Sequence, residues 1–337
     1  SVQRVLGLEP IPNADAIELA RINGWQCVVK KGEFAVGDLG VYFEIDAVPP
    51  DTPPFQFLWQ PKEPAGEPVA RPAKFRIRTI KLRGALSQGL LMPPHLFDLP
   101  DAAEGDDLTA ALDVGKYEPP QPLIGNGEIR GLFPRHVPKT DEIRVQSVPQ
   151  VLDEIAGLPY VCTLKYDGSS ATFCLDPDDG SLHVCSRNFS IREGENTLWR
   201  LARELEIEAA LRRRPELAIQ GEVCGPGIQK NRLDLRRIEL FVFSLYDSVA
   251  RRYLSDGELR AFCQDNGLQA VALADSGPAF GYDLPALLAL AEGKYPGTAN
   301  EREGIVIRPA SETVSEALGG RLSFKAISNR FLLKEGD

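Results

Sequence analysis

The stretch YVCTLKYDGSSATF, residues 160–173, decides how the second half of this 337-residue chain folds. It begins as an apolar run rich in β-forming residues, and an Asp–Gly turn signal follows shortly after Lys165. Side chains alternate between the two faces of a strand, so one face holds every second residue. That face is expected to carry Val161, Thr163, Lys165 and Asp167, and the other Cys162, Leu164 and Tyr166. The pattern predicts a strand that ends with a lysine and an aspartate side by side.

Lys165 has two interpretations at this point. As a surface lysine beside Asp167 it forms an ion pair that contributes well under ~1 kcal/mol. As a nucleophile it must lose its proton, and lowering a pKa of ~10.4 to ~7 requires roughly 4 to 5 kcal/mol of destabilisation of the cation. A nearby carboxylate acts in the wrong direction. A divalent metal bound by Asp167 and other acids would reverse that effect. The tetrapeptide alone does not decide between them.

Length and composition indicate a folded protein of two domains. Hydrophobic residues make up 43% of the chain and charged residues 26%, which is ordinary for a soluble globular protein. No apolar run approaches the roughly 20 residues that span a bilayer, and the N-terminus lacks the order of a signal peptide. Six scattered cysteines without a CxxC pair are typical of reduced thiols. We therefore expect a cytoplasmic protein without membrane contact.

The first third indicates a small all-β domain, residues 1–125. Residues 25–30, 31–38 and 39–48 form β-rich runs, and 49–72 contain eight prolines, which predicts an extended loop insertion. In KFRIRTIKLRG, residues 74–84, the apolar positions change from odd to even, so the inward face is expected to change at Thr79 through a bulge or barrel corner. The net charge of −10 argues against a protein that merely coats nucleic acid, but it leaves room for a local basic groove.

Residues 126–337 mix strands and helices. Leu198, Leu201 and Leu205 lie at helical spacing behind cap candidates Asn196 and Thr197, and a capping box begins a second helix at Ser255. Between and after these helices lie β-rich runs at 217–223, 239–246, 303–308 and 321–327. Strands mostly in hairpins with few helices predict an α+β domain on antiparallel sheet. No GxGxxG or P-loop is present, so a nucleotide would be bound in another way.

Six segments occur in an order that resembles the covalent nucleotidyltransferases, which are ATP-dependent DNA and RNA ligases and mRNA capping enzymes. They correspond to motifs I, Ia, III, IIIa, IV and V. In chain order they are TLKYDGSS (163–170), SRN (186–188), IQGEVCGPGIQKNR (219–232), FVFSLYD (241–247), EGIVIR (303–308) and SFKAIS (323–328). The resemblance makes Lys165 the residue that becomes covalently attached to AMP.

Two features favour the RNA ligase branch. DNA ligases carry arginine where this chain has Ser170, and GEVCGPGIQKNR is similar to motif III of RNA ligase 2-like enzymes. A β-domain before the catalytic domain resembles the Deinococcus-type nick-sealing RNA ligases, the fifth RNA ligase family, whose N-terminal domain is an OB-fold barrel. Residues 5–24 also resemble OB-type tRNA-binding modules. On such a surface Lys74, Arg76 and Arg78 would alternate onto one face and follow a phosphate backbone.

The resemblance implies three transfers: Lys165 takes AMP from ATP, AMP moves to a 5′-phosphate, and a 3′-hydroxyl displaces it. It implies Mg²⁺ or Mn²⁺ bound by Asp167, Glu222 and Glu303. Lys325 of motif V would neutralise the α-phosphate. Related ligases often carry a second lysine where this chain has Ser323. The remaining nucleotide contacts implied are Gly168, Arg187, Asn188, Phe243 with Phe241 as alternative, and Arg144 and Lys139 for the β and γ phosphates.

The implied substrate is a nicked duplex with an RNA 3′-hydroxyl strand and a 5′-phosphate strand of RNA or DNA, sealed by a monomer. A DNA ligase and a capping-type guanylyltransferase remain the alternative enzymes. An RNA-binding protein with a decayed catalytic domain is the alternative without activity. Composition and spacing say nothing about the sugar on either side of the nick.

Overall fold

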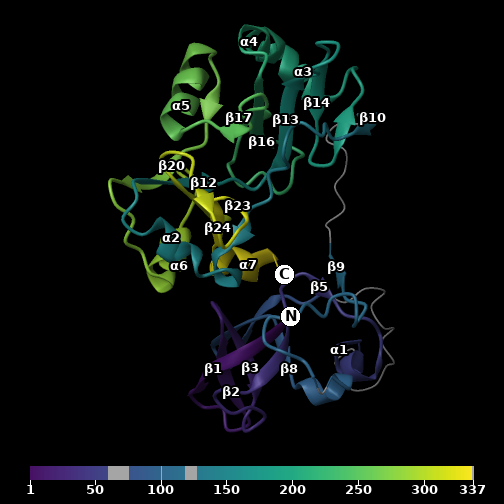
Figure 1. The fold of residues 1–337 in the computed structure, drawn as a ribbon, viewed down its shortest axis with the longest axis vertical. Helices are drawn as coiled ribbons and strands as arrows, with labels where there is room; N and C mark the ends of the chain where they lie inside the picture. The colour runs from purple at the N-terminus through teal and green to yellow at the C-terminus, as the bar shows by residue number, and fades with distance from the viewer. Residues whose placement is uncertain (60–75, 100, 118–126, 336–337) are drawn as a thin grey trace. The chain divides into compact units, whose positions relative to one another are not determined.

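The computed structural model describes residues 1–59, 76–99, 101–117 and 127–335, and the chain forms two compact units. Unit 1 comprises Ser1–Pro120 with Leu332–Asp337, and unit 2 comprises Gln121–Phe331 (Figure 1). Among the described residues, no helix has the length and apolar character needed to cross a membrane. The predicted boundary between 125 and 126 lies outside the described residues.

Unit 1 is built on an antiparallel sheet with the strand order β3-β2-β1-β4-β8. The strand β7 lies along β3, because the Val28 amide donates to Ser87 Oγ at 3.0 Å and the Gln26 side chain donates to the Leu86 carbonyl at 2.8 Å. The result is a nearly closed barrel, which confirms the predicted OB fold. Its strands are β1 Val2–Pro10, β2 Ile17–Ile22, β3 Trp25–Lys30, β4 Leu39–Phe43, β5 Ala47–Val48, β6 Thr79–Leu82, β7 Ala85–Gln88, β8 Leu90–Met92 and β9 Gly115–Lys116.

Two predictions for unit 1 are wrong. Residues 31–38 form turns rather than a strand, because Gly32 and Gly37 have φ of 76° and 98°, and Phe34 from this segment fills the barrel core. The inward face does not change at Thr79: Ile77 and Thr79 are both buried, whereas Ile80 is 45% exposed. Ile80 therefore does not face inward, Lys81 after it is exposed as well, and β6 pairs with β7 without a register shift.

The basic run and the proline-rich insertion are only partly described. Arg76 is paired with Asp46 at 2.6 Å and stacks over the Tyr117 ring at 4.4 Å, so its charge is already partnered. Lys74 and most of the insertion lie outside the described residues. The described part of the insertion is not simply extended, since it contains short helices. The helical turns of unit 1 are η1 Pro53–Phe55, α1 Gln56–Trp59 and η2 Pro94–Phe97.

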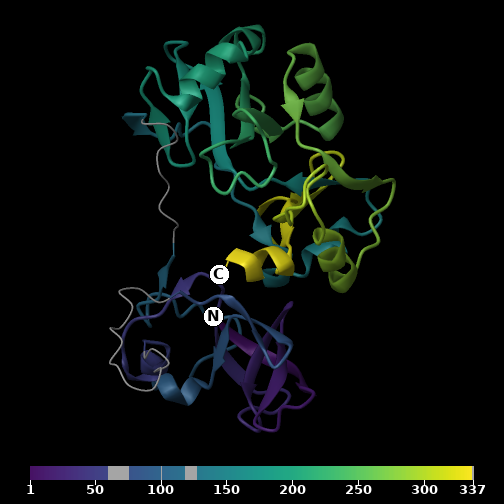
Figure 2. The same cartoon turned by 180° about the vertical axis from the view of Figure 1, so that it is seen from behind.

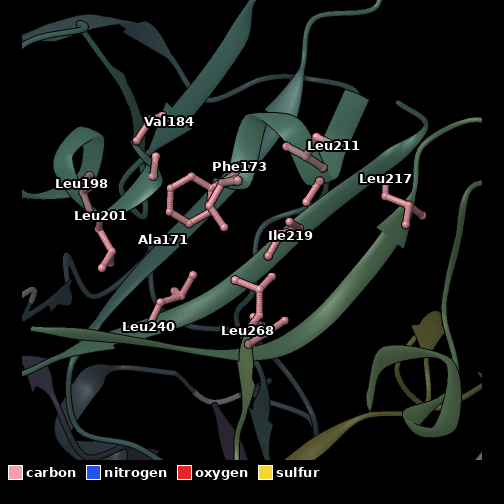
Figure 3. Close-up of a cluster of buried hydrophobic side chains, with 14 of the residues drawn as sticks. Ala171, Phe173, Val184, Leu198, Leu201, Leu211, Leu217, Ile219, Leu240 and Leu268 are labelled. Carbon is pink, nitrogen blue, oxygen red and sulfur yellow. The ribbon is translucent and has the colours of Figure 1, made fainter. Parts of the chain in front are cut away.

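Unit 2 contains a large sheet in the order β10-β15-β14-β13-β16-β17-β18, with β19 beside β17. Helices from α3, α4 and α5 pack with this sheet around a core that includes Phe173, Ile219 and Leu211 (Figures 2 and 3). The bounds are β10 Ile129–Leu132, β13 Ser169–Leu175, β14 Leu182–Cys185, β15 Phe189–Ile191, β16 Leu217–Cys224, β17 Glu239–Asp247, β18 Arg252–Tyr253, β19 Gln269–Ala270, α3 Thr197–Glu204, α4 Ile207–Arg213 and α5 Asp256–Asp265.

The helix caps follow the sequence. The Asn196 side chain accepts a hydrogen bond from the Trp199 amide at the start of α3, and Ser255 forms a capping box with Glu258 at the start of α5. The apolar run from 197 is divided into two helices, because Glu206 has φ of 50° and interrupts the helical backbone.

A second sheet of unit 2 has the order β11-β24-β21-β12-β20. Cys162, Leu164 and Tyr166 point into its core, which confirms the alternation predicted for β12. The bounds are β11 Ile143–Arg144, β12 Tyr160–Lys165, β20 Leu273–Gly277, β21 Gly304–Pro309, β22 Val314–Ser315, β23 Gly320–Arg321, β24 Phe324–Ile327, η3 Val145–Ser147, α2 Val151–Ile155, α6 Leu284–Ala291 and α7 Asn329–Glu335. Together the two units confirm the α+β class.

The Asp–Gly pair after Lys165 is not a hairpin turn. β12 belongs to the second sheet and β13 to the large sheet, so the chain passes from one sheet to the other at residues 166–168. Gly168 is needed for this crossing: a Cβ there would lie 2.4 Å from the Val223 carbonyl oxygen and 2.6 Å from Cys224 Sγ. The constraint on Gly168 therefore comes from strand β16 as well as from any bound nucleotide.

Candidate active site

Lys165 stands at the end of β12, opposite the first residue of β21. Its Nζ atom lies 2.7 Å from Oε1 of Glu303, the residue immediately before β21. The antiparallel register pairs Lys165 with Gly304, which brings motif I and motif IV together. The partner of Lys165 is thus Glu303, from a distant part of the chain, rather than the sequence neighbour Asp167.

The charges around Lys165 are crowded. Burial disfavours its ammonium, but the carboxylates of Glu303, Glu222 and Asp167 outweigh burial and raise the pKa of Lys165. Burial, together with the negative charges of Glu303 and Asp167, raises the pKa of Glu222 to about 8 although Lys165 opposes the change. Glu222 is held in place because its Oε1 accepts the Gly168 amide at 3.1 Å. The ammonium of Lys165 is therefore surrounded by three carboxyl groups, of which Glu303 is its direct partner.

Asp167 is held by an arginine that the sequence reasoning did not assign. Arg232 Nε lies 3.0 Å from Asp167 Oδ2, and the guanidinium rests over the Phe331 ring at 4.7 Å. Only 8% of Arg232 is exposed. Arg232 is the last residue of the motif III segment GEVCGPGIQKNR, so its place in that motif is the sequence signal that points to it.

A single buried hydroxyl joins the ends of motif I and motif IV. Tyr295 donates its phenolic proton to the Lys165 carbonyl at 2.7 Å. The same oxygen accepts the amides of Asp167 at 3.0 Å and Glu303 at 3.2 Å. Tyr295 is 2% exposed, and no motif pointed to it. This hydroxyl fixes the backbone on which Lys165, Asp167 and Glu303 are carried.

Replacement of Tyr295 by phenylalanine keeps the ring and removes only the hydroxyl. Two amides and one carbonyl lose their partner, so we expect the free energy of unfolding to fall by about 1–3 kcal/mol. Transfer of AMP to the protein should slow by about tenfold or more, because Lys165 and Glu303 lose their common anchor. Urea denaturation and a labelled-ATP time course measure the two effects. Unchanged transfer would contradict this role, and Tyr117→Phe is the matched control in unit 1.

Lys325 and Arg144 lie on neighbouring strands. Lys325 is in β24, where its antiparallel partner is Val306 of β21 and its parallel partner is Arg144 of β11. Burial lowers the pKa of Lys325 to about 8, and the cations Lys165 and Arg144 add to the effect. The predicted cations of motif V and of the segment before motif I thus meet beside Lys165.

A β-bulge distinguishes the two phenylalanines of motif IIIa. The pairing of β16 with β17 is interrupted, so that Gln220 faces Ser244, Gly221 faces Val242, and Phe243 is the extra residue. Phe241 is 7% exposed and packs edge-on against Tyr166 at 4.8 Å. Phe241 therefore belongs to the hydrophobic core. Phe243 is only partly buried, which leaves it as the aromatic candidate for the nucleotide base.

Motif Ia meets the segment before motif I. Arg187 and Asn188 form the turn between β14 and β15; Arg187 pairs with Asp141, and Lys139 Nζ donates to Asn188 Oδ1 at 2.9 Å. Contacts from residues 139 and 141 thus hold the segment before motif I against the turn that carries Arg187 and Asn188. Thr140 lies 3.1 Å from Ser170 and ties the same segment to β13.

Asp167, Glu222 and Glu303 are the oxygen donors grouped around Lys165. Within the described residues, no three His, Cys, Asp or Glu side chains converge closely enough to hold a metal ion by themselves. The carboxyl groups of Glu222, Glu303 and Asp167 do all lie near enough to Lys165 to interact electrostatically with its ammonium. Oxygen ligands with excess negative charge suit Mg²⁺ or Mn²⁺, especially when water completes the coordination.

The two-sheet domain with a lysine at the sheet crossing defines a nucleotidyltransferase of the ligase type. The chain belongs to the RNA ligase family, because the family model described as RNA ligase matches residues 158–327. A model described as an OB-fold domain matches residues 1–94. The chain is therefore an enzyme of the RNA ligase class. A search of curated protein sequences gave no match.

Solved structures of Naegleria gruberi RNA ligase are similar over the whole chain. The structure with PPi is 36% identical, with a TM-score of 0.87, covering 100% of this chain and 98% of that one. A lysine-to-alanine variant with ATP and Mn is 34% identical, with a TM-score of 0.85, covering 98% and 97%. A glutamate-to-alanine variant with AMP and Mn is 35% identical, with a TM-score of 0.85 and the same coverage.

Proposed function

We propose that this RNA ligase seals nicks in duplexes with an RNA 3′-hydroxyl strand through a covalent Lys165–AMP intermediate, and that it belongs with the Deinococcus-type enzymes. The observation that carries the proposal is the Lys165 ammonium, 2.7 Å from Glu303 at the point where the chain crosses between sheets. ATP and Mn in the Naegleria gruberi structures support ATP and a divalent cation as cofactors here.

The first step forms a bond between Lys165 Nζ and the α-phosphorus of ATP. The bond from that phosphorus to the oxygen bridging to the β-phosphate breaks, and pyrophosphate leaves. A 5′-phosphate oxygen then attacks the same phosphorus, and the bond to Lys165 Nζ breaks. Finally the 3′-hydroxyl oxygen attacks the 5′-phosphorus, its proton passes to solvent, and AMP leaves as the strand closes. Lys325 and Arg144 would offset the phosphate charge, and Lys139, Arg187 and Asn188 would bind the phosphates or ribose. Phe243 would stack on the adenine.

Lys165 must lose its proton before the first step. Its three acidic neighbours raise its pKa, so the protein alone holds the ammonium form. A bound Mg²⁺ or Mn²⁺, held by Asp167, Glu222 and Glu303, would supply positive charge that offsets these acids and polarises the phosphate. Arg232 and Tyr295 would keep Asp167 and Glu303 oriented for this role.

The remaining features concern the nucleic acid. We propose that unit 1 binds the duplex, which its OB fold supports, and that the enzyme acts as a monomer. We also propose a cytoplasmic location, because all six cysteines are free and buried, as is typical of reducing compartments.

The test uses the full chain and four nicked duplexes that differ only in the sugar on each side of the nick. We expect sealing to fall by about tenfold or more when the 3′-hydroxyl nucleotide changes from ribose to deoxyribose, since a site built to bind a hydroxyl discriminates strongly. Replacing ribose on the 5′-phosphate side should change the rate much less. Gel electrophoresis of end-labelled strands measures both rates.

Other outcomes would select the alternatives. Equal sealing of ribose and deoxyribose ends would favour a DNA ligase, and labelling by GTP in place of ATP would favour a guanylyltransferase. An RNA-binding protein with a decayed catalytic domain would take up no label from either nucleotide.

A further inference from the structure

Arg308 of β21 is buried, and it makes hydrogen bonds to three separate segments. Its Nε donates to Ser323 Oγ at 2.9 Å, one terminal nitrogen donates to the Phe243 carbonyl at 2.8 Å, and the other donates to Glu142 Oε1 at 2.9 Å. Ser323 Oγ in turn donates to Glu142 Oε1 at 2.7 Å, which closes the network. Arg308 is 7% exposed, so these bonds form largely away from water.

Each partner lies beside a residue proposed to contact the nucleotide. Ser323 is two residues before Lys325, and Glu142 is two residues before Arg144. Lys325 and Arg144 are themselves paired across β24 and β11. The third contact is to the backbone of Phe243. One guanidinium therefore sets the relative positions of three groups around the nucleotide.

The bulge in β17 explains why Phe243 needs this contact. As the extra residue of the bulge, Phe243 lies outside the regular pairing with β16, and its carbonyl requires another donor. Arg308 supplies that donor. Arg321 adds a second contact at the next residue, since it donates to Ser244 Oγ at 3.3 Å and stacks over Tyr253 at 3.9 Å.

The network also accounts for Ser323, where related ligases often have lysine. A hydroxyl can accept from Arg308 and donate to Glu142 at the same time, whereas an ammonium has only donors. A lysine at this place would put a second cation against the buried Arg308 guanidinium. Ser323 thus fits the network, since its hydroxyl has Arg308 as donor and Glu142 as acceptor.

We infer that Arg308, Glu142 and Ser323 form a positioning network that holds Phe243, Arg144 and Lys325 in register around ATP, and that Ser323 is not a vacated phosphate contact. The inference rests on the proposed function, because it assumes that ATP lies against these three groups. It assigns Arg308 no contact with the reacting atoms.

The test begins with Ser323→Lys, which restores the more common residue. If Ser323 belongs to the positioning network, kcat/KM of AMP transfer in Ser323→Lys should fall by about tenfold or more. If position 323 is instead a vacated phosphate contact, kcat/KM should rise. Ser323→Thr keeps the hydroxyl and should retain most of the rate. That result would show that substitution at position 323 does not by itself slow AMP transfer, and that the loss in Ser323→Lys follows from loss of the hydroxyl and gain of the charge. A rise or no change in Ser323→Lys would overturn the inference.

Arg308→Lys provides the second variant, with Arg212→Lys on the exposed side of α4 as the control. We expect a higher KM for ATP and weaker discrimination against GTP, because the Phe243 carbonyl loses its donor. The amplitude of labelling counts the folded, active fraction separately from KM. A reduced amplitude with unchanged KM and unchanged discrimination would mean that Arg308 is merely structural, and would overturn the inference.

A readout without chemistry separates this inference from the proposed function. Calorimetry with α,β-methylene-ATP, whose α–β bridge cannot break, measures nucleotide affinity alone. If the natural chain takes up no label but Arg308→Lys still weakens binding of this analogue by about tenfold, only the proposed function fails. If the natural chain is labelled and Arg308→Lys binds the analogue equally well, only the network inference fails.

Discussion

A Lys165→Ala protein incubated with α-labelled ATP and Mg²⁺ or Mn²⁺ is expected to carry no label after denaturing electrophoresis, a loss of at least about a thousandfold relative to the natural chain. In the proposed mechanism the label is attached to Nζ of Lys165 at the end of β12, and alanine has no nucleophile to replace it. Lys165→Arg should be equally inactive, because a guanidinium does not lose its proton in proteins.

The control for this experiment is Lys31→Ala, at an exposed turn of unit 1. It removes the same side chain from unit 1, whereas Lys165 belongs to unit 2, and it should label as fast as the natural protein. Circular dichroism of each variant confirms that it is folded. Labelling of Lys165→Ala at the normal rate would eliminate the covalent mechanism, and with it the role given to Glu303.

The second large effect concerns Lys325. We expect Lys325→Gln to slow AMP transfer by about 10²–10³, the usual cost of removing one donor that stabilises charge in the transition state. The magnitude is smaller than for Lys165 because Arg144 still provides positive charge nearby. Single-turnover labelling measures the rate, and a loss below about threefold would contradict the role.

The role of Lys325 also predicts how kcat/KM for AMP transfer changes with pH. The pKa of Lys325 is about 8, below the ordinary lysine value, so the ammonium is present below pH 8 and is lost as the pH rises through 8. Since kcat/KM reports the groups of the free enzyme, it should decline on the alkaline side near pH 8. In Lys325→Arg the charge persists, and this decline should disappear. An identical alkaline limb in both proteins would assign it to another group.

Strand β12 and its two faces could be predicted from the sequence because alternation is a local property of the chain. The sheet that the next strand, β13, joins could not be predicted in this way. An Asp–Gly pair ordinarily favours a hairpin, but β12 finds its neighbours in β20 and β21, and the following strand joins the other sheet. Pairing over such separations is decided by the whole core, and no short window of sequence contains it.

The site residues that stand in motifs could be predicted from the sequence, and those whose role depends on the fold could not. Lys165, Glu222, Glu303 and Lys325 stand in motifs that the order of segments made visible. Tyr295 stands in none, and its importance depends on one oxygen reaching three backbone groups. The bulge that separates Phe243 from Phe241 is likewise a property of the register between two strands.

The strand pairing of β12 also has a consequence for biosynthesis. Lys165 is made about halfway along the chain, but the adjacent strand β21 ends at Pro309, and β24, which pairs with β21 and carries Lys325, ends at Ile327. Contacts of such long sequence separation form slowly and only after the later segments exist. A nascent chain that has just emerged past Lys165 therefore has no ion pair with Glu303 and no adjacent Lys325. If Lys165 is the nucleophile that we propose, we expect it to stay unreactive towards ATP until synthesis of unit 2 is almost complete.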